Sequence, residues 1–254
     1  MNYKNALSLF LAFYKTIGYL FLFIAFGLFL DSKYLVPIFE NVQHIATLVM
    51  LIGFSVLFYR SPSRIREQML FAVVIGFLGE HLFSMALGMY TYRLGNVPLY
   101  VPPGHAIVYI AAVYFCKDAI VKRYRRPLEK LFTIFIFLYA TLFLIFANDI
   151  FGFVMSLLVV FLLRNKPRER LFFLTMYIVV AFLEIVGTHY QCWSWPKTAF
   201  GVFPFLKSAN PPSGISLFYF LLDLGCLWLY KQRNLMAWKR MKGIRKWKEI
   251  KMYG

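Results

Sequence analysis

Residues 131–147 read LFTIFIFLYATLFLIFA, a run without a single charge. Similar runs stand at 20–30 (LFLFIAFGLFL) and 155–163 (MSLLVVFLL), and none of them leaves a polar face. Helices that are apolar on every side belong in lipid or in a very large core. A chain of 254 residues that is 61% hydrophobic and only 15% charged fits the lipid interpretation. The sequence therefore predicts an all-α polytopic membrane protein.

The apolar runs predict eight membrane spans, because a span needs about 20 residues. They lie at 12–30, 42–59, 68–89, 105–121, 128–147, 149–164, 171–190 and 213–231. The first run is longer than the apolar part of a signal peptide, and no small-residue cleavage site follows it. We therefore interpret it as the first span.

The basic residues predict the orientation. All but four of the 28 Lys and Arg residues fall on one side of the spans; the four are Lys33, Arg93, Lys197 and Lys207. Cytoplasmic loops are enriched in Lys and Arg, so both termini are expected in the cytoplasm, with the chain in the cytoplasmic membrane of a prokaryote. This distribution accounts for the net charge of +17 without a nucleic-acid partner.

The basic tail, residues 232–254, interleaves Lys and Arg with Trp238 and Trp247. This pattern is typical of an interfacial helix on an anionic cytoplasmic leaflet. A tail that binds a partner protein is the alternative.

The second half of the sequence echoes the first. The arginines at 60, 64 and 66 recur 104 residues later at 164, 168 and 170, and Glu80 recurs at the same distance as Glu184. This spacing predicts two related four-span halves, 1–122 and 123–231. Parallel repeats pack about an axis along the membrane normal and share a site between them.

Three acidic residues, Glu80, Glu184 and Asp223, fall inside predicted spans, near the midplane or in the outer half. A carboxylate there costs several kcal/mol unless it is paired, neutralised or in contact with water, so each is a candidate catalytic residue. Low dielectric favours the protonated carboxyl group, which can act as an acid. The alternative is an interhelical hydrogen bond that only holds the bundle together.

The histidines, His44, His81, His105 and His189, all lie towards the predicted outer half. Metal binding by these four is an alternative, but no HxxxH, HxxH or HxxE pair places two ligands on one helical face. We therefore predict no metal and no cofactor. His105 is a candidate proton partner for the glutamates, with helix capping or interfacial packing as the alternative.

Aromatic residues gather where the outward spans end: Tyr90, Tyr92, Tyr100, Trp193 and Trp195. Tyr and Trp are common at membrane interfaces in any case. However, residues i and i+2 of an extended segment share a face, so each pair can present two rings to one cleft. Because ring faces stabilise cations, these five are predicted to line a substrate pocket.

Buried acids beside aromatic faces favour one class of chemistry. An acid protonates an isoprenoid double bond, and aromatic faces stabilise the carbocation while it cyclises, captures water or loses a proton. The sequence therefore predicts an enzyme that hydrates, cyclises or isomerises a long apolar isoprenoid lipid. A proton-coupled transporter or lipid-binding protein is the main alternative, and a structural membrane subunit is a third.

A buried glutamate is followed by a Gly-x-Tyr-x-Tyr motif and a Pro-containing segment within the stretch 76–110; the positions are Glu80, Gly88, Tyr90, Tyr92, Leu94, Gly95, Pro98 and Pro102, with a weaker echo at 184–220. With these positions the stretch resembles the carotenoid-biosynthesis membrane proteins, which include bacterioruberin-type carotenoid hydratases and the small membrane lycopene cyclases. The resemblance implies a carotenoid-like substrate. Lycopene cyclases carry a proline followed by paired acids where this chain reads PPGH and PPSG, so direct carotene cyclisation is disfavoured.

Overall fold

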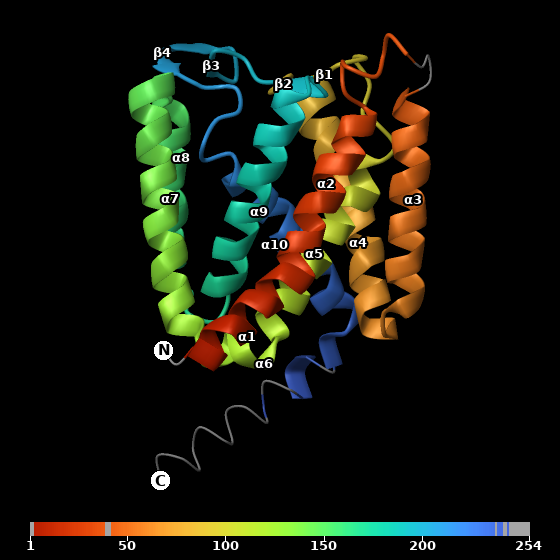
Figure 1. Ribbon diagram of the computed structural model, residues 1–254, viewed down its shortest axis with the longest axis vertical. Coiled ribbons are helices and arrows are strands. Elements are labelled where there is room, and N and C mark those ends of the chain that lie inside the picture. Colours follow the sequence, from red (N-terminus) through yellow and green to blue (C-terminus); the bar gives the residue numbers. More distant parts are fainter. Residues whose placement is uncertain (1–2, 39–41, 237, 241–242, 244–254) are drawn as a thin grey trace.

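The computed structural model describes residues 3–38, 42–236, 238–240 and 243, and this part of the chain is mostly helical. Figure 1 shows the long helices side by side in one bundle, with the short strands gathered at one end. We call this the strand-bearing end. Helix α1 begins and helix α10 ends at the opposite end (Figure 1), which we call the basic end because most Lys and Arg residues of the described ranges belong to helix ends and loops there.

A helix lies at each of the eight predicted positions. In chain order the helices are α1 (Tyr3–Phe13) continued by the π-helical η1 (Tyr14–Gly18) and α2 (Tyr19–Leu30), α3 (Val42–Arg60), α4 (Ser63–Glu80) continued by the π-helical η2 (His81–Ala86), α5 (Val101–Lys117), the short α6 (Ala119–Arg123), α7 (Arg125–Ala147), α8 (Ile150–Leu163), α9 (Arg170–His189) and α10 (Ser216–Arg233). The strands are β1 (Thr91–Tyr92), β2 (Trp193–Ser194), β3 (Thr198–Ala199) and β4 (Phe203–Lys207).

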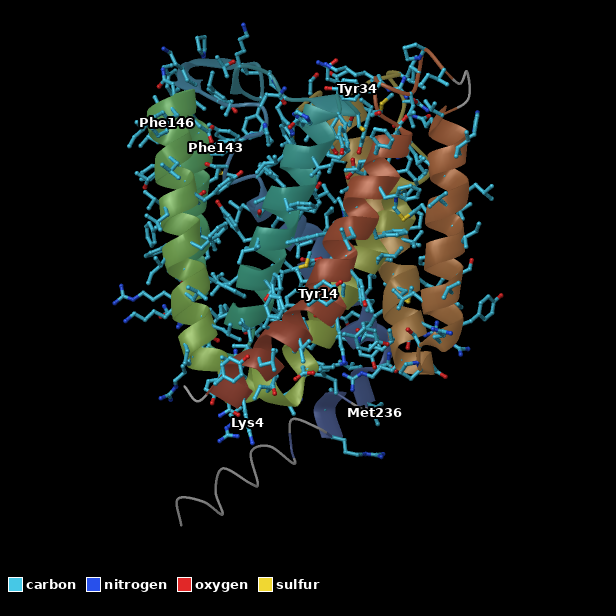
Figure 2. The ribbon with its side chains drawn as sticks, in the orientation of Figure 1. Lys4, Tyr14, Tyr34, Phe143, Phe146 and Met236 are labelled. Atoms are coloured by element: carbon cyan, nitrogen blue, oxygen red, sulfur yellow. The ribbon has the colours of Figure 1, made fainter. Side chains whose placement is uncertain are left out.

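Five of these helical segments are long and apolar enough to cross a membrane: Tyr3–Leu30, Val42–Arg60, Ser63–Ala86, Arg125–Ala147 and Arg170–His189. Helix α8 is apolar but shorter. Their outer faces carry large apolar side chains, as at Phe146 on α7, which is 83% exposed (Figure 2). Such surfaces suit contact with lipid, so the prediction of an all-α integral membrane protein is confirmed.

Several helices begin earlier than the hydropathy predicts. Helix α5 begins at Val101, because Pro102 and Pro103 fit the first helical turn, where no backbone N–H is needed. Helix α4 begins at Ser63, so a polar turn precedes its apolar stretch. The first helix already begins at Tyr3.

Four helices form a closed ring at the centre of the bundle. Helix α4 packs against α5, α5 against α9, α9 against α10, and α10 against α4. The outer helices come in two pairs, α2 with α3 and α7 with α8. Helix α2 crosses the bundle obliquely and packs on α9, which also contacts α7 (Figure 1).

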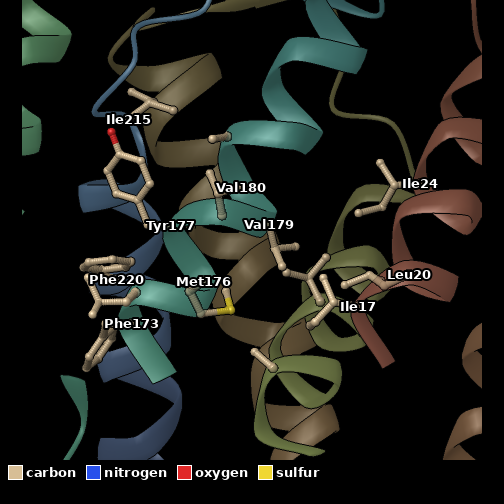
Figure 3. Close-up of a cluster of buried hydrophobic side chains, with 14 of the residues drawn as sticks. Ile17, Leu20, Ile24, Phe173, Met176, Tyr177, Val179, Val180, Ile215 and Phe220 are labelled. Carbon is tan, nitrogen blue, oxygen red and sulfur yellow. The ribbon is translucent and has the colours of Figure 1, made fainter. Parts of the chain in front are cut away.

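The apolar core surrounds α9. Figure 3 shows Ile17 and Leu20 of the first helix facing Met176 and Val179 of α9. On the opposite side of α9, Tyr177 and Phe173 lie towards α10. A helix buried on both sides holds its side chains in fixed positions, which suits a helix that carries a site residue.

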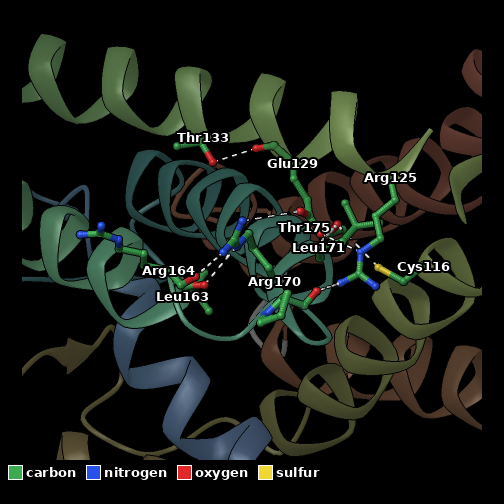
Figure 4. Close-up of polar contacts among 10 residues, drawn as sticks. Cys116, Arg125, Glu129, Thr133, Leu163, Arg164, Arg170, Leu171 and Thr175 are labelled. Carbon is green, nitrogen blue, oxygen red and sulfur yellow. Dashed lines mark hydrogen bonds and ion pairs between the residues drawn. The ribbon is translucent and has the colours of Figure 1, made fainter. Parts of the chain in front are cut away.

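Polar contacts tie the helices together at the basic end. Glu129 of α7 pairs with Arg125 at 2.7 Å and with Arg170 of α9 at 3.9 Å (Figure 4). Lys4 and Met236 also lie at this end, opposite Tyr34 (Figure 2). The predicted interfacial helix at 232–254 lies largely outside the described residues, including Trp247.

Candidate functional site

The central ring of helices surrounds a cluster of buried polar side chains near the strand-bearing end. Each helix of the ring contributes one residue to this cluster. They are Glu80 from α4, His105 from α5, Glu184 from α9 and Tyr219 from α10. The loops after α4 and α9 add four aromatic side chains, Tyr90, Tyr92, Trp193 and Trp195.

Glu80 is the last residue of α4 and is 3% exposed. Its Oε2 atom accepts hydrogen bonds from the hydroxyl groups of Tyr90 and of Tyr92, the latter at 2.6 Å. Its Oε1 atom lies 2.7 Å from Nε2 of His105. The two carboxylate oxygens therefore face different partners, two phenols on one side and an imidazole on the other.

The backbone after Glu80 explains how two tyrosines return to it. The π-helical turn η2 ends the helix at Ala86, and Gly88 then takes a positive φ of 58°. A side chain at this position would be strained, so glycine allows the chain to reverse. The Ser84 hydroxyl donates to the carbonyl of Tyr90 at 3.1 Å and fixes the returning segment.

Glu184 lies within α9 and is 2% exposed. Its Oε2 atom accepts the indole N–H groups of Trp193 at 2.8 Å and of Trp195 at 2.9 Å. Its Oε1 atom accepts the hydroxyl of Tyr219 at 2.7 Å. Gly187 makes this possible, because a Cβ atom there would overlap the indole ring of Trp193.

The two glutamates thus have the same pattern of partners. In each case Oε2 accepts two aromatic donors spaced two residues apart, and Oε1 faces a donor on the next helix of the ring. The two loops also meet, because β1 pairs antiparallel with β2 and Tyr92 stands opposite Trp193. The rings of Tyr90 and Trp195 lie 4.5 Å apart between centroids.

The electrostatic environments of the two glutamates differ. Glu80 can form an ion pair with His105 when the imidazole is protonated, whereas the hydrogen-bond donors to Glu184 are all neutral. Burial raises the pKa of Tyr90 well above its usual range, and the charges of Glu80 and Glu184 raise it further. Tyr90 therefore stays protonated and remains a hydrogen-bond donor to Glu80.

Two apolar pockets meet at this cluster. The larger, of about 800 Å³, lies among α2, α3 and α5, and its polar lining is Tyr90, Tyr92, Tyr100, His105, Glu184, Trp193 and Tyr219. The smaller, of about 300 Å³, is bordered by Glu80 and Trp195. Tyr90 and Tyr219 line both pockets, so these two side chains form the partition between them.

A polar hollow of about 710 Å³ lies above the cluster at the strand-bearing end, and we call it the vestibule. Its lining residues come from β1, β2, the end of α9, the residues just after β1 and α9, and the later loop: Thr91, Tyr92, Arg93, Thr188, Gln191, Trp193, Ser194 and Asn210. Arg93 pairs there with Asp31, a residue with no exposed surface.

The remaining predicted residues lie at different distances from the cluster. Tyr100 lines the large pocket and donates its hydroxyl to Asp31 at 2.8 Å. Asp223 lies one helical turn beyond Tyr219 on α10 and lines neither apolar pocket. Its Oδ2 atom is buried without a hydrogen-bond partner among the described residues.

The histidines do not come together. His105 pairs with Glu80, whereas His81 is exposed and bonds to the carbonyl of Phe77. In the described ranges, no three His, Cys, Asp or Glu side chains lie close enough to hold a metal ion, with His44 and His189 included.

Sequence reasoning missed three polar residues. Tyr219 lies four residues before Asp223, a spacing that places both on one face of α10.

Asp31 and Asp149 occupy equivalent places in the two predicted halves. Each follows the first helix of its half, and each binds the loop that leads into the last helix of the same half. Asp149 accepts backbone N–H groups of Ala209 at 3.0 Å and Ser213 at 2.7 Å. The shared position after the first helix is the signal that could have found them.

The fold and the cluster define the chain as an all-α integral membrane protein with two buried glutamates held by aromatic hydrogen-bond donors. Comparisons with protein-family models, with curated proteins and with solved structures find no match.

Proposed function

We propose that this protein is a membrane enzyme that hydrates, cyclises or isomerises a long isoprenoid lipid, with one buried glutamate as acid and the other as base. The observation that carries the proposal is the position of both carboxyl groups at the edge of apolar pockets. Glu184 borders the large pocket and Glu80 the small one. Carboxyl groups inside a membrane are costly and mark functional sites.

The chemistry begins with proton transfer from a carboxyl group to one carbon of a double bond. The π electrons form the new C–H bond and leave a cation on the other carbon. The cation then loses a neighbouring proton, is attacked by a second double bond, or takes up water. Attack by a second double bond leaves a new cation, which then loses a proton or takes up water. In each case the released proton passes to the basic carboxylate or to His105, and its transfer from there to the acidic carboxyl group returns the site to its starting state.

The aromatic side chains supply the stabilisation that a carbocation needs. Tyr90, Tyr92 and Trp193 border the large pocket, and hydrogen bonds to the two glutamates hold each of these rings. A ring face attracts a cation within about 6 Å. Because the rings are already fixed, they need no reorganisation when the charge forms.

We also propose the membrane arrangement that the sequence predicts, with eight spans in two related halves and both termini in the cytoplasm of a prokaryote. Three features support it: the matched surroundings of Glu80 and Glu184, the matched placement of Asp31 and Asp149, and the antiparallel pairing of β1 with β2. A two-fold axis along the membrane normal pairs equivalent strands antiparallel. Lys and Arg collect at the basic end, as expected for a cytoplasmic face that contacts anionic lipid.

Proton-coupled transport is a second candidate. It is favoured by the partition of Tyr90 and Tyr219, which separates two pockets with one glutamate beside each. Acidic residues at the interface of two repeats are a common feature of such transporters.

Comparing the apolar lipids of cells with and without the protein tests the proposal. A lipid heavier by one water, or an isomer of unchanged mass, is expected only in cells with the protein. Glu80→Gln and Glu184→Gln should abolish this product. Glu67→Gln is the matched control, because Glu67 lies on α4 near the basic end and pairs with Arg233 at 2.8 Å.

The outcomes separate the candidates. Wild-type yield in both glutamine variants refutes the acid mechanism. Unchanged lipids together with proton uptake that depends on Glu80 refute the enzyme and favour the transporter.

A further inference from the structure

The vestibule and the large apolar pocket share two side chains, Tyr92 and Trp193. Both are well buried, at 5% and 6% exposure. Their polar atoms bind the two glutamates, since Tyr92 donates to Glu80 at 2.6 Å and Trp193 donates to Glu184 at 2.8 Å. One layer of aromatic rings thus separates the vestibule from both carboxyl groups.

The walls of the vestibule suit water. Thr91, Gln191, Ser194 and Asn210 offer neutral hydrogen-bonding groups, in contrast to the apolar walls of the other pockets. The only charged side chain among its lining residues, Arg93, is paired with Asp31, so the hollow does not select an anion. The Nε atom of Arg93 is buried and meets no acceptor among the described residues, which leaves a donor for a water molecule.

We infer that water reaches the two buried glutamates from the strand-bearing end through this vestibule, with Tyr92 and Trp193 as the pair that closes the route. The inference extends the proposed function, because hydration consumes water and every variant of the reaction exchanges protons. Its test requires no substrate, so it stands or falls separately from the lipid chemistry.

The chain contains a matched pair of reporters for this route. Trp193 and Trp195 donate to the same Oε2 atom of Glu184, at 2.8 and 2.9 Å, and their exposures are 6% and 8%. Only Trp193 lines the vestibule, whereas Trp195 borders the small apolar pocket. Burial and hydrogen bonding alone therefore predict equal exchange of the two indole protons with solvent, or slightly faster exchange at Trp195.

The experiment measures hydrogen–deuterium exchange of the indole N–H groups by NMR, on the full chain labelled with ¹⁵N-tryptophan in lipid nanodiscs. Trp193→Phe and Trp195→Phe assign the two signals. The expected result is exchange several-fold faster at Trp193 than at Trp195. Ser194→Phe, which places a ring in the wall of the vestibule, should slow exchange at Trp193 and leave Trp195 unchanged.

Thr198→Phe is the control, because Thr198 lies in β3 and does not line the vestibule. It should change neither rate. Equal rates in the unmodified protein, faster exchange at Trp195, or no effect of Ser194→Phe would overturn the inference. If exchange is faster at Trp193 but the lipid products are unchanged in the Glu80→Gln and Glu184→Gln variants, the water route is supported and the proposed enzymatic function is refuted.

Discussion

Replacing Glu184 by alanine should destabilise the protein much more than replacing it by glutamine. The carboxylate accepts three hydrogen bonds, from Trp193, Trp195 and Tyr219. A glutamine can turn its carbonyl oxygen to both indoles and donate its amide to the Tyr219 oxygen, so both indole N–H groups keep an acceptor and Tyr219 keeps a hydrogen bond to residue 184. An alanine leaves the two indole N–H groups without an acceptor inside the bundle.

The size of the effect follows from these contacts. A buried donor without an acceptor costs about 1–3 kcal/mol, so the two indoles together cost about 2–6 kcal/mol. The hydroxyl of Tyr219 can rotate and is left out of this sum. The cavity left by alanine acts in the same direction. We therefore expect the alanine variant to be at least about 2 kcal/mol less stable than the glutamine variant.

The assay is the free energy of unfolding in mixed micelles with increasing SDS, followed by far-UV circular dichroism. Glu67→Ala and Glu67→Gln serve as a control pair, since the Glu67 side chain is 26% exposed and bonds at the surface with Arg233. These two should differ by less than about 1 kcal/mol. If the two variants at position 184 agree within about 0.5 kcal/mol, the reasoning about the buried donors is refuted.

Two further predictions concern the aromatic side chains. Gly187→Ala should lower the free energy of unfolding by about 1–3 kcal/mol, because the added Cβ overlaps the Trp193 ring. Gly225→Ala is the control in the same assay and should be neutral or stabilising, because its Cβ makes only ordinary contacts. Burial raises the pKa of Tyr90 and of Tyr92, so tyrosines of the unfolded chain lose their protons first, near about pH 10. The stability that these two tyrosines contribute should therefore be constant below about pH 10 and be lost above it, so the fall in stability above this pH should be less steep when both are changed to Phe. A rise in stability above this pH would contradict the assignment.

Much of the architecture follows from the sequence, because a span is recognised from a sum over about 20 residues. The run at 131–147 lies within helix α7, and each of the other predicted positions also holds a helix. The helix boundaries were less well predicted. Helix α5 begins earlier than its apolar run because prolines fit its first turn, and helix α4 begins earlier because polar turns precede its apolar run.

The sequence indicated which residues belong to the candidate site better than it indicated the contacts among them. The matched spacing of Glu80, Glu184 and the aromatic pairs led us to assign them to one site, and the structure places them in one cluster. The pairs were expected to line a pocket, and they also hold the carboxyl groups through hydrogen bonds. That second role depends on how the loops fold back, which spacing along the chain does not specify.

Tyr219 and Asp31 were missed for different physical reasons. The residues of α10 that face α9 are set by the packing of the ring, and α10 carries apolar residues on several sides. Asp31 follows a span, where a solvated charge is the ordinary case. It is buried instead because Arg93 and Tyr100 reach it from a distant loop.

The pairing of β1 with β2 makes the length of each loop as important as its composition. Because successive residues of a strand point to opposite faces, one residue inserted between Gly88 and Tyr90 turns both tyrosines away from Glu80. The same insertion shifts Tyr92 out of register with Trp193, so the disturbance spreads to the second glutamate. Randomised libraries of this protein should therefore tolerate many single substitutions in these loops while rejecting single-residue insertions and deletions.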